Sequence, residues 1–468
     1  MKRPDLDRTE SRGRRAWTTA VAIVVFIAAA SAADLSARPQ EASAVERLTL
    51  SEAVARARET YPSLAAARAG EEASAAAVGE ATADRWPELR AQANLTRFQE
   101  PMLVAPLHGF DISTPPEFDQ TLIRGDVSFA WTVYDGGARG ARIRAARAEA
   151  VGAGATRQAA DMALITRTAR VYLEILATHG VLEAQDRRIA ALEAEGSRVR
   201  QFLEQGRAAA VELLRVQAAL ADARAGRVAT ATRLDLAERQ LGRLIDVPVD
   251  SVRASRLVSL SLAPAADLED RAELVARAQA ASPELERSRQ AVIAAEAARR
   301  AAIAAWIPKL SLFGGYLGFS GFGGDLTAEW QAGIGVSYPL FTGGGRSAAT
   351  RTAEARARRA REELQLAELE IADRVDAALN AALETRARVE AVAEGVQHQS
   401  EVVRIELLSL EAGAGTQTDY LRAEADLMRV RSALVEARHA EIAARVELAR
   451  ALGELTPEWL AENLENVR

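Results

Sequence analysis

The chain carries one pattern of residues twice, and this repetition limits its fold more than any other feature. The sequence VARA begins at Val54 and again at Val275, and Pro62 is matched by Pro283 at the same offset. A later block repeats at a second constant offset, which is fourteen residues shorter; its pairs are Tyr134 with Phe341, Gly136 with Gly343, and Gly206 with Gly413. Self-similarity at a fixed offset indicates a supersecondary unit that is used twice. The sequence therefore predicts an internal twofold repeat, with an insertion in a loop of the first copy.

Each copy predicts the same order of elements. An alanine-rich helix comes first, over about 51–84 and about 268–305. We expect Pro87 and Pro308 to end it, because a helix cannot easily continue through proline. A strand, a loop rich in turn residues and a second strand follow. Two long stretches without proline then predict paired helices, over about 138–205 and 208–245 in the first copy and about 346–412 and 416–452 in the second.

The predicted strands alternate between apolar residues and polar or small ones. In the first copy Val127, Phe129, Trp131 and Val133 are separated by serine, alanine and threonine. Such alternation predicts a sheet with one apolar and one polar face. Aromatic residues on the apolar face are typical of a sheet that faces lipid; the candidate lipid-facing residues are Phe129, Trp131, Trp330, Ile334 and Tyr338. The pattern alone leaves a second interpretation open, in which each hairpin packs on a water-soluble core.

Four strands are too few to close a barrel, and an open sheet edge is not tolerated in lipid. If the sheet faces lipid, the chain must therefore oligomerise, and a trimer would supply twelve strands. The predicted helix over 138–205 would be ~100 Å long if it is continuous, at about 1.5 Å per residue. A helix of this length is typical of a coiled coil or of a structure that crosses a wide space.

A run of glycines follows the last strand of each copy. These glycines are Gly343, Gly344 and Gly345 after YPLFT, and Gly136 and Gly137 at the matching place in the first copy. A glycine-rich turn after a strand can hold phosphate, but neither segment contains the Gly-Lys-Ser/Thr of a P-loop. Because the feature occurs twice, we interpret it as a joint between sheet and helix, where positive φ angles favour glycine. Pro339 belongs to this joint because it lacks the N–H that a strand ladder needs.

Composition excludes several classes of protein. The chain has no cysteine, which excludes disulfide scaffolds, thiolate metal sites and a lipid on an N-terminal cysteine. The formal net charge of -6 gives no basic excess for nucleic acid. The histidines have no metal-ligand spacing, and we expect them to be solvated; they are His108, His179, His398 and His439. No Gly-x-Ser-x-Gly motif is present, and we expect neither an enzyme nor a cofactor.

The first residues predict an export signal. Arg12, Arg14 and Arg15 precede a mostly apolar run over 16–30, and Ala30-Ser31-Ala32 offers a cleavage site. The run is short for a transmembrane anchor, which needs about 20 residues. A cleaved signal is therefore favoured, and the cleavage position stays open. The predicted organisation is a signal peptide at 1–32, a linker at 33–47, a first repeat at 48–246 with its hairpin at 86–134, an inter-repeat segment at 247–267, a second repeat at 268–453 with its hairpin at 307–341, and a tail at 454–468.

The doubled layout of helix, hairpin and paired long helices resembles the TolC family of outer-membrane factors. The resemblance covers about 48–453. The motifs that carry it are LTLSEAVARARETYP, WPEL and IPKL, WTVYDGG and YPLFTGG, EQGRAAAVELLRVQAAL, and EAGAGTQTDYLRAEADL. Each motif is loose by itself, and their occurrence in order and in two copies makes the resemblance specific.

The resemblance implies an α+β membrane protein that forms a homotrimer. In this family a twelve-stranded β-barrel in the cell outer membrane, with four strands per chain, is continuous with a long α-helical barrel in the periplasm. Such a duct passively conducts drugs, ions or proteins from a periplasmic adaptor and an inner-membrane RND or ABC pump, in tripartite efflux or type I secretion. The expected partners are therefore further copies of the chain, the adaptor, the pump and outer-membrane lipid. Nothing in the residues selects the substrate, such as metal cations, or the particular adaptor and pump.

The family also has a ring of acidic residues at the narrow periplasmic tip, whose turns are here assigned to Gly206 and Gly413. The matching acid is Asp419, and its repeat mate is Glu212. Three copies of each would place six carboxylates near a constriction, where they attract cations. Some members have a second acid three residues later, where this chain has Arg422 and its mate Arg215. Ordinary ion pairs at i,i+3 spacing are therefore the alternative to a selective ring.

One other function stays open on the sequence. An exported periplasmic coiled-coil scaffold, whose hairpins bind a partner protein, would share the export signal and the long helices. It would have no channel activity.

Overall fold

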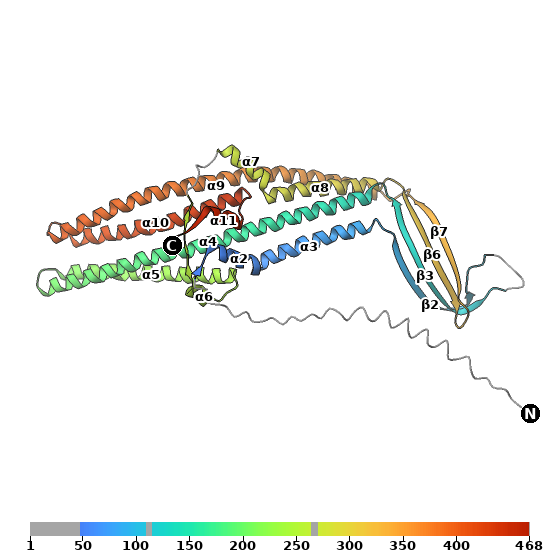
Figure 1. Ribbon diagram of the computed structural model, residues 1–468, viewed down its shortest axis with the longest axis horizontal. Coiled ribbons are helices and arrows are strands. Elements are labelled where there is room, and N and C mark those ends of the chain that lie inside the picture. The colour runs from blue at the N-terminus through green and yellow to red at the C-terminus, as the bar shows by residue number, and fades with distance from the viewer. Residues whose placement is uncertain (1–46, 109–114, 264–269, 468) are drawn as a thin grey trace, which may run out of the picture. The chain divides into compact units, whose positions relative to one another are not determined.

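The computed structural model describes residues 47–108, 115–263 and 270–467. Within these ranges the protein is mostly helical, with a four-stranded sheet and two short two-stranded pairings (Figure 1). The predicted signal peptide lies outside the described residues, as does the predicted linker apart from Arg47. No helix in the described ranges is both long enough and apolar enough to cross a membrane.

Two very long helices form where the absence of proline predicted them. α4 (Ala138–Glu204) and α9 (Gly345–Glu411) each contain 67 residues, which corresponds to ~100 Å at about 1.5 Å per residue. α5 (Ala210–Leu244) and α10 (Gln417–Ala451) contain 35 residues each, and they return beside α4 and α9 respectively (Figure 1). The predicted boundaries of all four helices lie within two residues of those observed.

Each predicted first helix is two helices in the structure. α2 (Leu50–Thr60) is followed by α3 (Pro62–Ala83), and α7 (Arg271–Ala281) is followed by α8 (Pro283–Ala304). The breaks are at Tyr61 (φ −74°, ψ 125°) and Ser282 (φ −64°, ψ 119°), whose backbones are extended. The prediction of single helices over 51–84 and 268–305 is wrong because proline excludes the preceding residue from helical geometry. Proline itself suits the first position of the next helix.

The long strands form one antiparallel sheet in the order β2-β3-β6-β7. They are β2 (Glu88–Leu103), β3 (Phe118–Tyr134), β6 (Lys309–Gly321) and β7 (Thr327–Ser337). The pairing of β3 with β6 joins the hairpins from the two halves of the chain. The predicted second hairpin extended to residue 341, but β7 ends at Ser337, since Pro339 has no N–H for the ladder.

The largest buried apolar cluster joins α2 to the middle of α4 and to the end of α5. Tyr172 of α4 is fully buried in this cluster. Its hydroxyl accepts a hydrogen bond from the N–H of Val258 at 2.8 Å and lies 2.8 Å from the carbonyl oxygen of Leu48. A buried hydroxyl needs such partners, and here it links residues that are far apart in the sequence.

Short elements from the inter-repeat segment and the tail meet beside this cluster. The inter-repeat segment forms α6 (Val249–Ala254), β4 (Arg256–Leu257) and β5 (Ser259–Leu262), and the tail forms α11 (Pro457–Asn463) and β8 (Leu464–Val467). β4 pairs in parallel with β1 (Arg47–Leu48), and β5 pairs antiparallel with β8. Hydrogen bonds thus connect the middle of the chain to segments near both ends of the described part.

Candidate functional site

The register of the sheet sorts its side chains onto two faces. Residues directly opposite each other in an antiparallel pair share a face. Three rows cross the sheet on the first face: Ala91, Val127, Tyr316 and Trp330; Leu89, Phe129, Gly314 and Ala332; and Trp131, Leu312 and Ile334. From the row of Leu95 to the row of Trp131, no position in the described register of this face is charged. We call it the uncharged face.

The uncharged face is open in the single chain. Trp330 is 77% exposed and Ile334 is 71% exposed, although both are large apolar side chains. Phe129 and Trp131 are partly exposed beside them, and Tyr338 follows the end of β7. Exposed apolar patches of this kind mark a surface that meets lipid or another protein.

The opposite face of the sheet is polar. Its rows include Arg90, Ser128 and Gln331, and Gln92, Asp126 and Glu329. Glu88, Lys309 and Arg124 lie on the same side. The period-two alternation of the sequence therefore corresponds to a real division of the sheet into an uncharged face and a charged one.

Two aromatic rings lie across glycines of the neighbouring strand. On the uncharged face, a Cβ added at Gly314 would be 2.6 Å from Cε1 of Phe129. On the polar face, a Cβ added at Gly333 would be 2.7 Å from Cζ of Phe313. Real Cβ atoms do not come this close, so each glycine leaves the space that a ring occupies.

Pairs of glycines connect the sheet to the long helices. Gly136 (φ 69°) and Gly137 (φ 88°) lie between β3 and α4, and Gly343 (φ 57°) and Gly344 (φ 82°) lie between β7 and α9. Positive φ angles are open to glycine and strained for other residues. Gly345 is the first residue of α9 and is not among the glycines with positive φ.

The helices that lead into the sheet end a short turn before their prolines. α3 ends at Ala83, before Pro87, and α8 ends at Ala304, before Pro308. The indole of Trp131 donates a hydrogen bond of 2.8 Å to the carbonyl oxygen of Arg85. The uncharged face is thus bonded to the end of α3.

At their other ends, both long helices stop at glycine. Gly206 (φ 71°) follows α4 and Gly413 (φ 73°) follows α9. After α4, the N–H of Arg207 donates to the carbonyl oxygen of Phe202 at 2.8 Å, and the N–H of Gly206 donates to that of Leu203 at 2.9 Å. This pair of bonds is the Schellman motif, in which a left-handed residue ends a helix. The chain then turns back into α5 or α10.

The candidate tip acids begin the returning helices. Asp419 lies in the first turn of α10, and its carboxylate accepts a hydrogen bond of 2.6 Å from the hydroxyl of Thr416. Glu212 lies in the first turn of α5. No ion pair within the described ranges joins Glu212 to Arg215 or Asp419 to Arg422, and both arginines are exposed.

A family model matches residues 53–246 and 274–454, which is most of the chain. The family is described as outer membrane efflux protein. The chain belongs to this family. It is accordingly a protein of the outer membrane that extends into the periplasm, and the family expected from the sequence motifs is confirmed.

Individual relatives of this outer membrane efflux protein are distant. Outer membrane efflux protein BepC of Brucella suis is 30% identical over 128 residues, which is 27% of this chain and 28% of BepC. The outer membrane protein VceC of Vibrio cholerae has a TM-score of 0.75 at 20% identity, over 86% of this chain and 96% of VceC. A membrane protein of Pseudomonas aeruginosa has a TM-score of 0.76 at 22% identity, over 86% of this chain and 93% of its own. At these identities the solved structures show a shared fold.

Titratable side chains of this outer membrane efflux protein also gather between α4, α5 and α10. His179, Glu238, Arg253 and His439 line a pocket of about 520 Å³ there. Burial lowers the pKa of His439 and of His179, and it raises the pKa of Glu238. The expectation of a solvated side chain is wrong for His439, which is half-buried with Nδ1 2.8 Å from the carbonyl oxygen of Val435. In the described part of the chain, no group of three or more histidine, aspartate and glutamate side chains is placed to hold a metal ion.

Arginines at the base of the sheet are the main feature that the sequence did not indicate. Arg346 lies in the first turn of α9. Its guanidinium carbon Cζ is 4.6 Å from the ring centroid of Trp306 and 5.1 Å from the ring centroid of Tyr338. Its Nε and Nη1 atoms are buried and have no hydrogen-bond partner within the described residues. Stacking on two rings stabilises such a cation. Trp306 lies in the turn after α8 and Tyr338 directly after β7, so this sandwich depends on the packing of both segments against α9.

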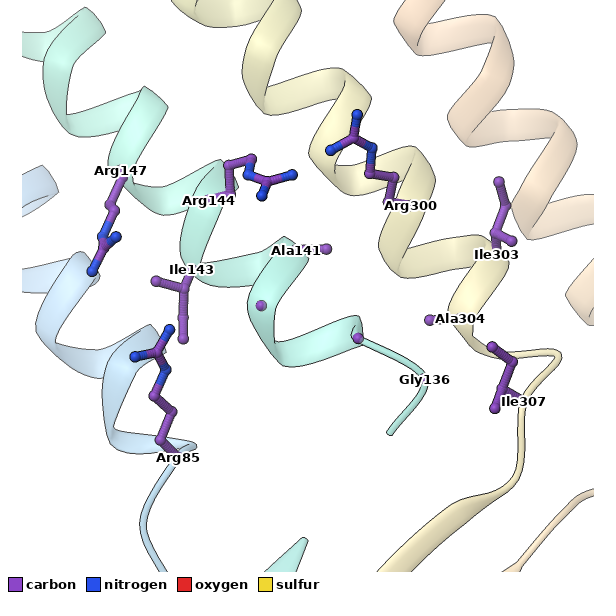
Figure 2. A pocket seen from close by; sticks show the side chains of 12 residues that line it. Arg85, Gly136, Ala141, Ile143, Arg144, Arg147, Arg300, Ile303, Ala304 and Ile307 are labelled. Carbon is purple, nitrogen blue, oxygen red and sulfur yellow. The ribbon is translucent and has the colours of Figure 1, made fainter. Parts of the chain in front are cut away.

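Four further arginines line a pocket near the same level of the fold (Figure 2). They are Arg85, Arg144, Arg147 and Arg300. The sequence spacing shows only that Arg144 and Arg147 share one face of a helix. Their convergence with Arg85 and Arg300 follows from the packing of α4 against α3 and α8, which the sequence pattern does not specify.

Proposed function

We propose that this outer membrane efflux protein is the exit duct of a tripartite efflux or type I secretion system. Three copies would close a twelve-stranded β-barrel that is continuous with an α-helical barrel in the periplasm. One observation carries the proposal: the sheet has an uncharged, exposed face, and its edge strands β2 and β7 each pair on one side only in the described residues. Open edges are not tolerated in lipid. In a ring of three chains, each β7 would pair with β2 of the next chain.

An internal twofold repeat is part of the same proposal. Corresponding helices of the two halves have equal lengths: 11 residues in α2 and α7, 22 in α3 and α8, 67 in α4 and α9, and 35 in α5 and α10. Each half also contributes one hairpin to the sheet. These equalities support one unit that is used twice in each chain.

The polar face of the sheet would line the pore. It carries charges of both signs, such as Arg90, Asp126 and Glu329. Passive conduction needs no catalytic group, and the energy for export would come from an inner-membrane RND or ABC pump through a periplasmic adaptor. We therefore infer a channel and not an enzyme.

The turns at Gly206 and Gly413 would form the periplasmic tip of this duct. Glu212 and Asp419 would surround the constriction, where carboxylates attract cations and repel anions. Arg215 and Arg422 lie one turn further along each helix and would reduce this preference.

The test compares two arginine substitutions on opposite faces of β7. Ile334→Arg places a charge on the uncharged face, which costs about 2–4 kcal/mol near the middle of a bilayer. Gln331→Arg places the same charge on the polar face. We expect Ile334→Arg to lose assembly in the outer membrane, and Gln331→Arg to assemble as a trimer with altered single-channel conductance in planar bilayers.

Two results would contradict the proposal. One is equal assembly of the two variants, because the sheet would then have no lipid-facing side. The other is a wild-type protein that is a periplasmic monomer without conductance, which would favour the coiled-coil scaffold.

A further inference from the structure

We infer that the arginine-lined pocket at the base of the sheet binds the phosphate group of an anionic phospholipid. The pocket lies between α4 and the ends of α3 and α8 and has a volume of about 570 Å³. The pocket adjoins the uncharged face. Trp131 of that face donates its indole hydrogen bond to the carbonyl oxygen of Arg85, and Arg85 lines the pocket. The inference rests on the proposed contact of the uncharged face with lipid.

The four arginines face one another in pairs. Figure 2 shows Arg144 of α4 and Arg300 of α8 extending toward each other, and Arg147 of α4 and Arg85 extending toward each other. No ion pair within the described residues includes any of the four. Like charges at such positions repel, and a bound anion would turn this repulsion into attraction.

Neighbouring arginines of α4 have partners, so a general excess of arginine does not explain the pocket. Arg142 lies 3.2 Å from the carboxylate of Asp84. Arg139 donates hydrogen bonds to the carbonyl oxygens of Asp84 and Val133. Between Arg139 and Arg147 of α4, the two arginines without an acidic partner are the two that line the pocket, as expected of a site that receives its negative charge from a ligand.

The rest of the lining suits a ligand that is charged at one end and apolar at the other. Guanidinium groups bind phosphate through paired hydrogen bonds. Ile143, Ile303 and Ile307 add apolar surface beside the arginines. Basic pockets at the edge of a membrane-embedded surface bind anionic headgroups. A free phosphate ion would satisfy the arginines but would make no use of the isoleucines, so the combination favours a phospholipid.

The test measures lipid binding to the purified full-length oligomer in detergent by native mass spectrometry. The probes are short-chain phosphatidylglycerol, which is anionic, and short-chain phosphatidylcholine, which is zwitterionic. The pocket variant is Arg144→Gln with Arg300→Gln. The control variant is Arg233→Gln with Arg431→Gln, which removes two exposed arginines of α5 and α10 that have no ion pair within the described residues.

We expect the wild type and the control to prefer phosphatidylglycerol, and the pocket variant to bind it about tenfold more weakly or worse. Binding of phosphatidylcholine should be the same in all three proteins. Equal binding of phosphatidylglycerol by the pocket variant and the control would overturn the inference. If the pocket variant does not assemble, the wild type alone still tests the inference. Equal affinity of the wild type for the two lipids would overturn the inference as well.

Inorganic phosphate distinguishes the two possible sources of the anion. Millimolar phosphate should leave phosphatidylglycerol binding unchanged, and complete displacement would assign the pocket to a soluble anion instead. Conductance of the same preparations in planar bilayers separates this inference from the proposed function. A conducting protein without lipid preference would contradict the pocket alone, whereas a protein that neither inserts nor conducts would contradict the proposed function.

Discussion

The hydroxyl of Thr416 donates a hydrogen bond of 2.6 Å to the carboxylate of Asp419, and it accepts one of 3.3 Å from the backbone N–H of the same residue. Thr416 therefore caps the start of α10, and the carboxylate of Asp419 holds the hydroxyl of this cap, in addition to the charge that it would present at the tip. Replacing Asp419 alone would change both properties. Thr416→Val separates them, because it removes the cap and keeps the carboxylate.

We expect Thr416→Val to lower the free energy of unfolding by about 1 kcal/mol and to leave ion selectivity unchanged. Glu212→Ala combined with Asp419→Ala should reduce both the preference for cations and the block by added cations. Thermal unfolding measures the loss of stability, whereas reversal potentials in asymmetric salt and titrations with a blocking cation, both in planar bilayers, measure the selectivity and the block. Wild-type selectivity in the double variant would show that these carboxylates do not form the constriction.

The contact of Phe313 with Gly333 gives a prediction for the sheet. In Gly333→Ala the added Cβ would lie 2.7 Å from Cζ of the ring, and overpacking of this kind costs about 1–3 kcal/mol. Gly335→Ala is the matched control on the same strand and face, where the nearest atom, Oγ of Ser311, would be at 3.4 Å. Thermal unfolding of the detergent-solubilised oligomer should be lowered by Gly333→Ala and nearly unchanged by Gly335→Ala.

Rescue tests the cause of that loss. Phe313→Leu shortens the side chain that opposes the added methyl group, so Gly333→Ala with Phe313→Leu should recover part of the melting temperature. If the double variant is less stable than either single one, the overpacking explanation is wrong.

The sequence predicted the elements of this fold better than their junctions. Side chains of a strand alternate with a period of two, so the pattern alone placed Phe129 and Trp131 on one face. Long stretches without proline likewise predicted α4 and α9. The breaks at Tyr61 and Ser282 were missed, because a proline inside an apolar helical pattern can either kink one helix or begin the next.

The candidate site was predicted only where local geometry determines it. Gly137 and Gly344 were recognised because a run of glycines follows the last strand in both copies of the repeat. The pocket arginines were not, since Arg85 and Arg300 approach Arg144 through the packing of different helices. The bond between Thr416 and Asp419 was also missed, although a threonine three residues before an acid is a known pattern at helix starts.

Gly137 of the joint and Gly140 of α4 provide a matched pair for the next prediction. Gly137 has φ 88° and Gly140 lies inside α4, and a Cβ added at either position meets no atom within 4 Å. The two positions therefore have equal room for a methyl group, and they differ only in backbone conformation. Gly137→Ala should lower the free energy of unfolding by about 1–2 kcal/mol through left-handed strain. Gly140→Ala should raise it by up to about 1 kcal/mol through helix propensity.

Thermal unfolding of the two variants beside the wild type measures the difference. Melting temperatures that move in the same direction would show that the backbone conformation at Gly137 is not what requires glycine there.

His439 gives a prediction for the dependence of stability on pH. Burial lowers its pKa in the folded chain below the ordinary value of 6.5. The unfolded chain therefore binds this proton more readily, so stability falls as the pH decreases through about 6.5 and is unaffected well above it. His439→Gln removes the titrating group while keeping a side chain that can donate to the carbonyl oxygen of Val435. His179 and Glu238, which line the same pocket, titrate equally in both proteins.

When the pH is lowered from about 7.5 to about 5.5, we expect the melting temperature of the wild type to fall further than that of His439→Gln. His398→Gln is the control, because His398 is exposed on α9 beside Glu394. Its loss over the same interval should equal that of the wild type. The prediction fails if His439→Gln and the wild type lose the same amount, since the half-buried imidazole would then make no contribution to stability at low pH.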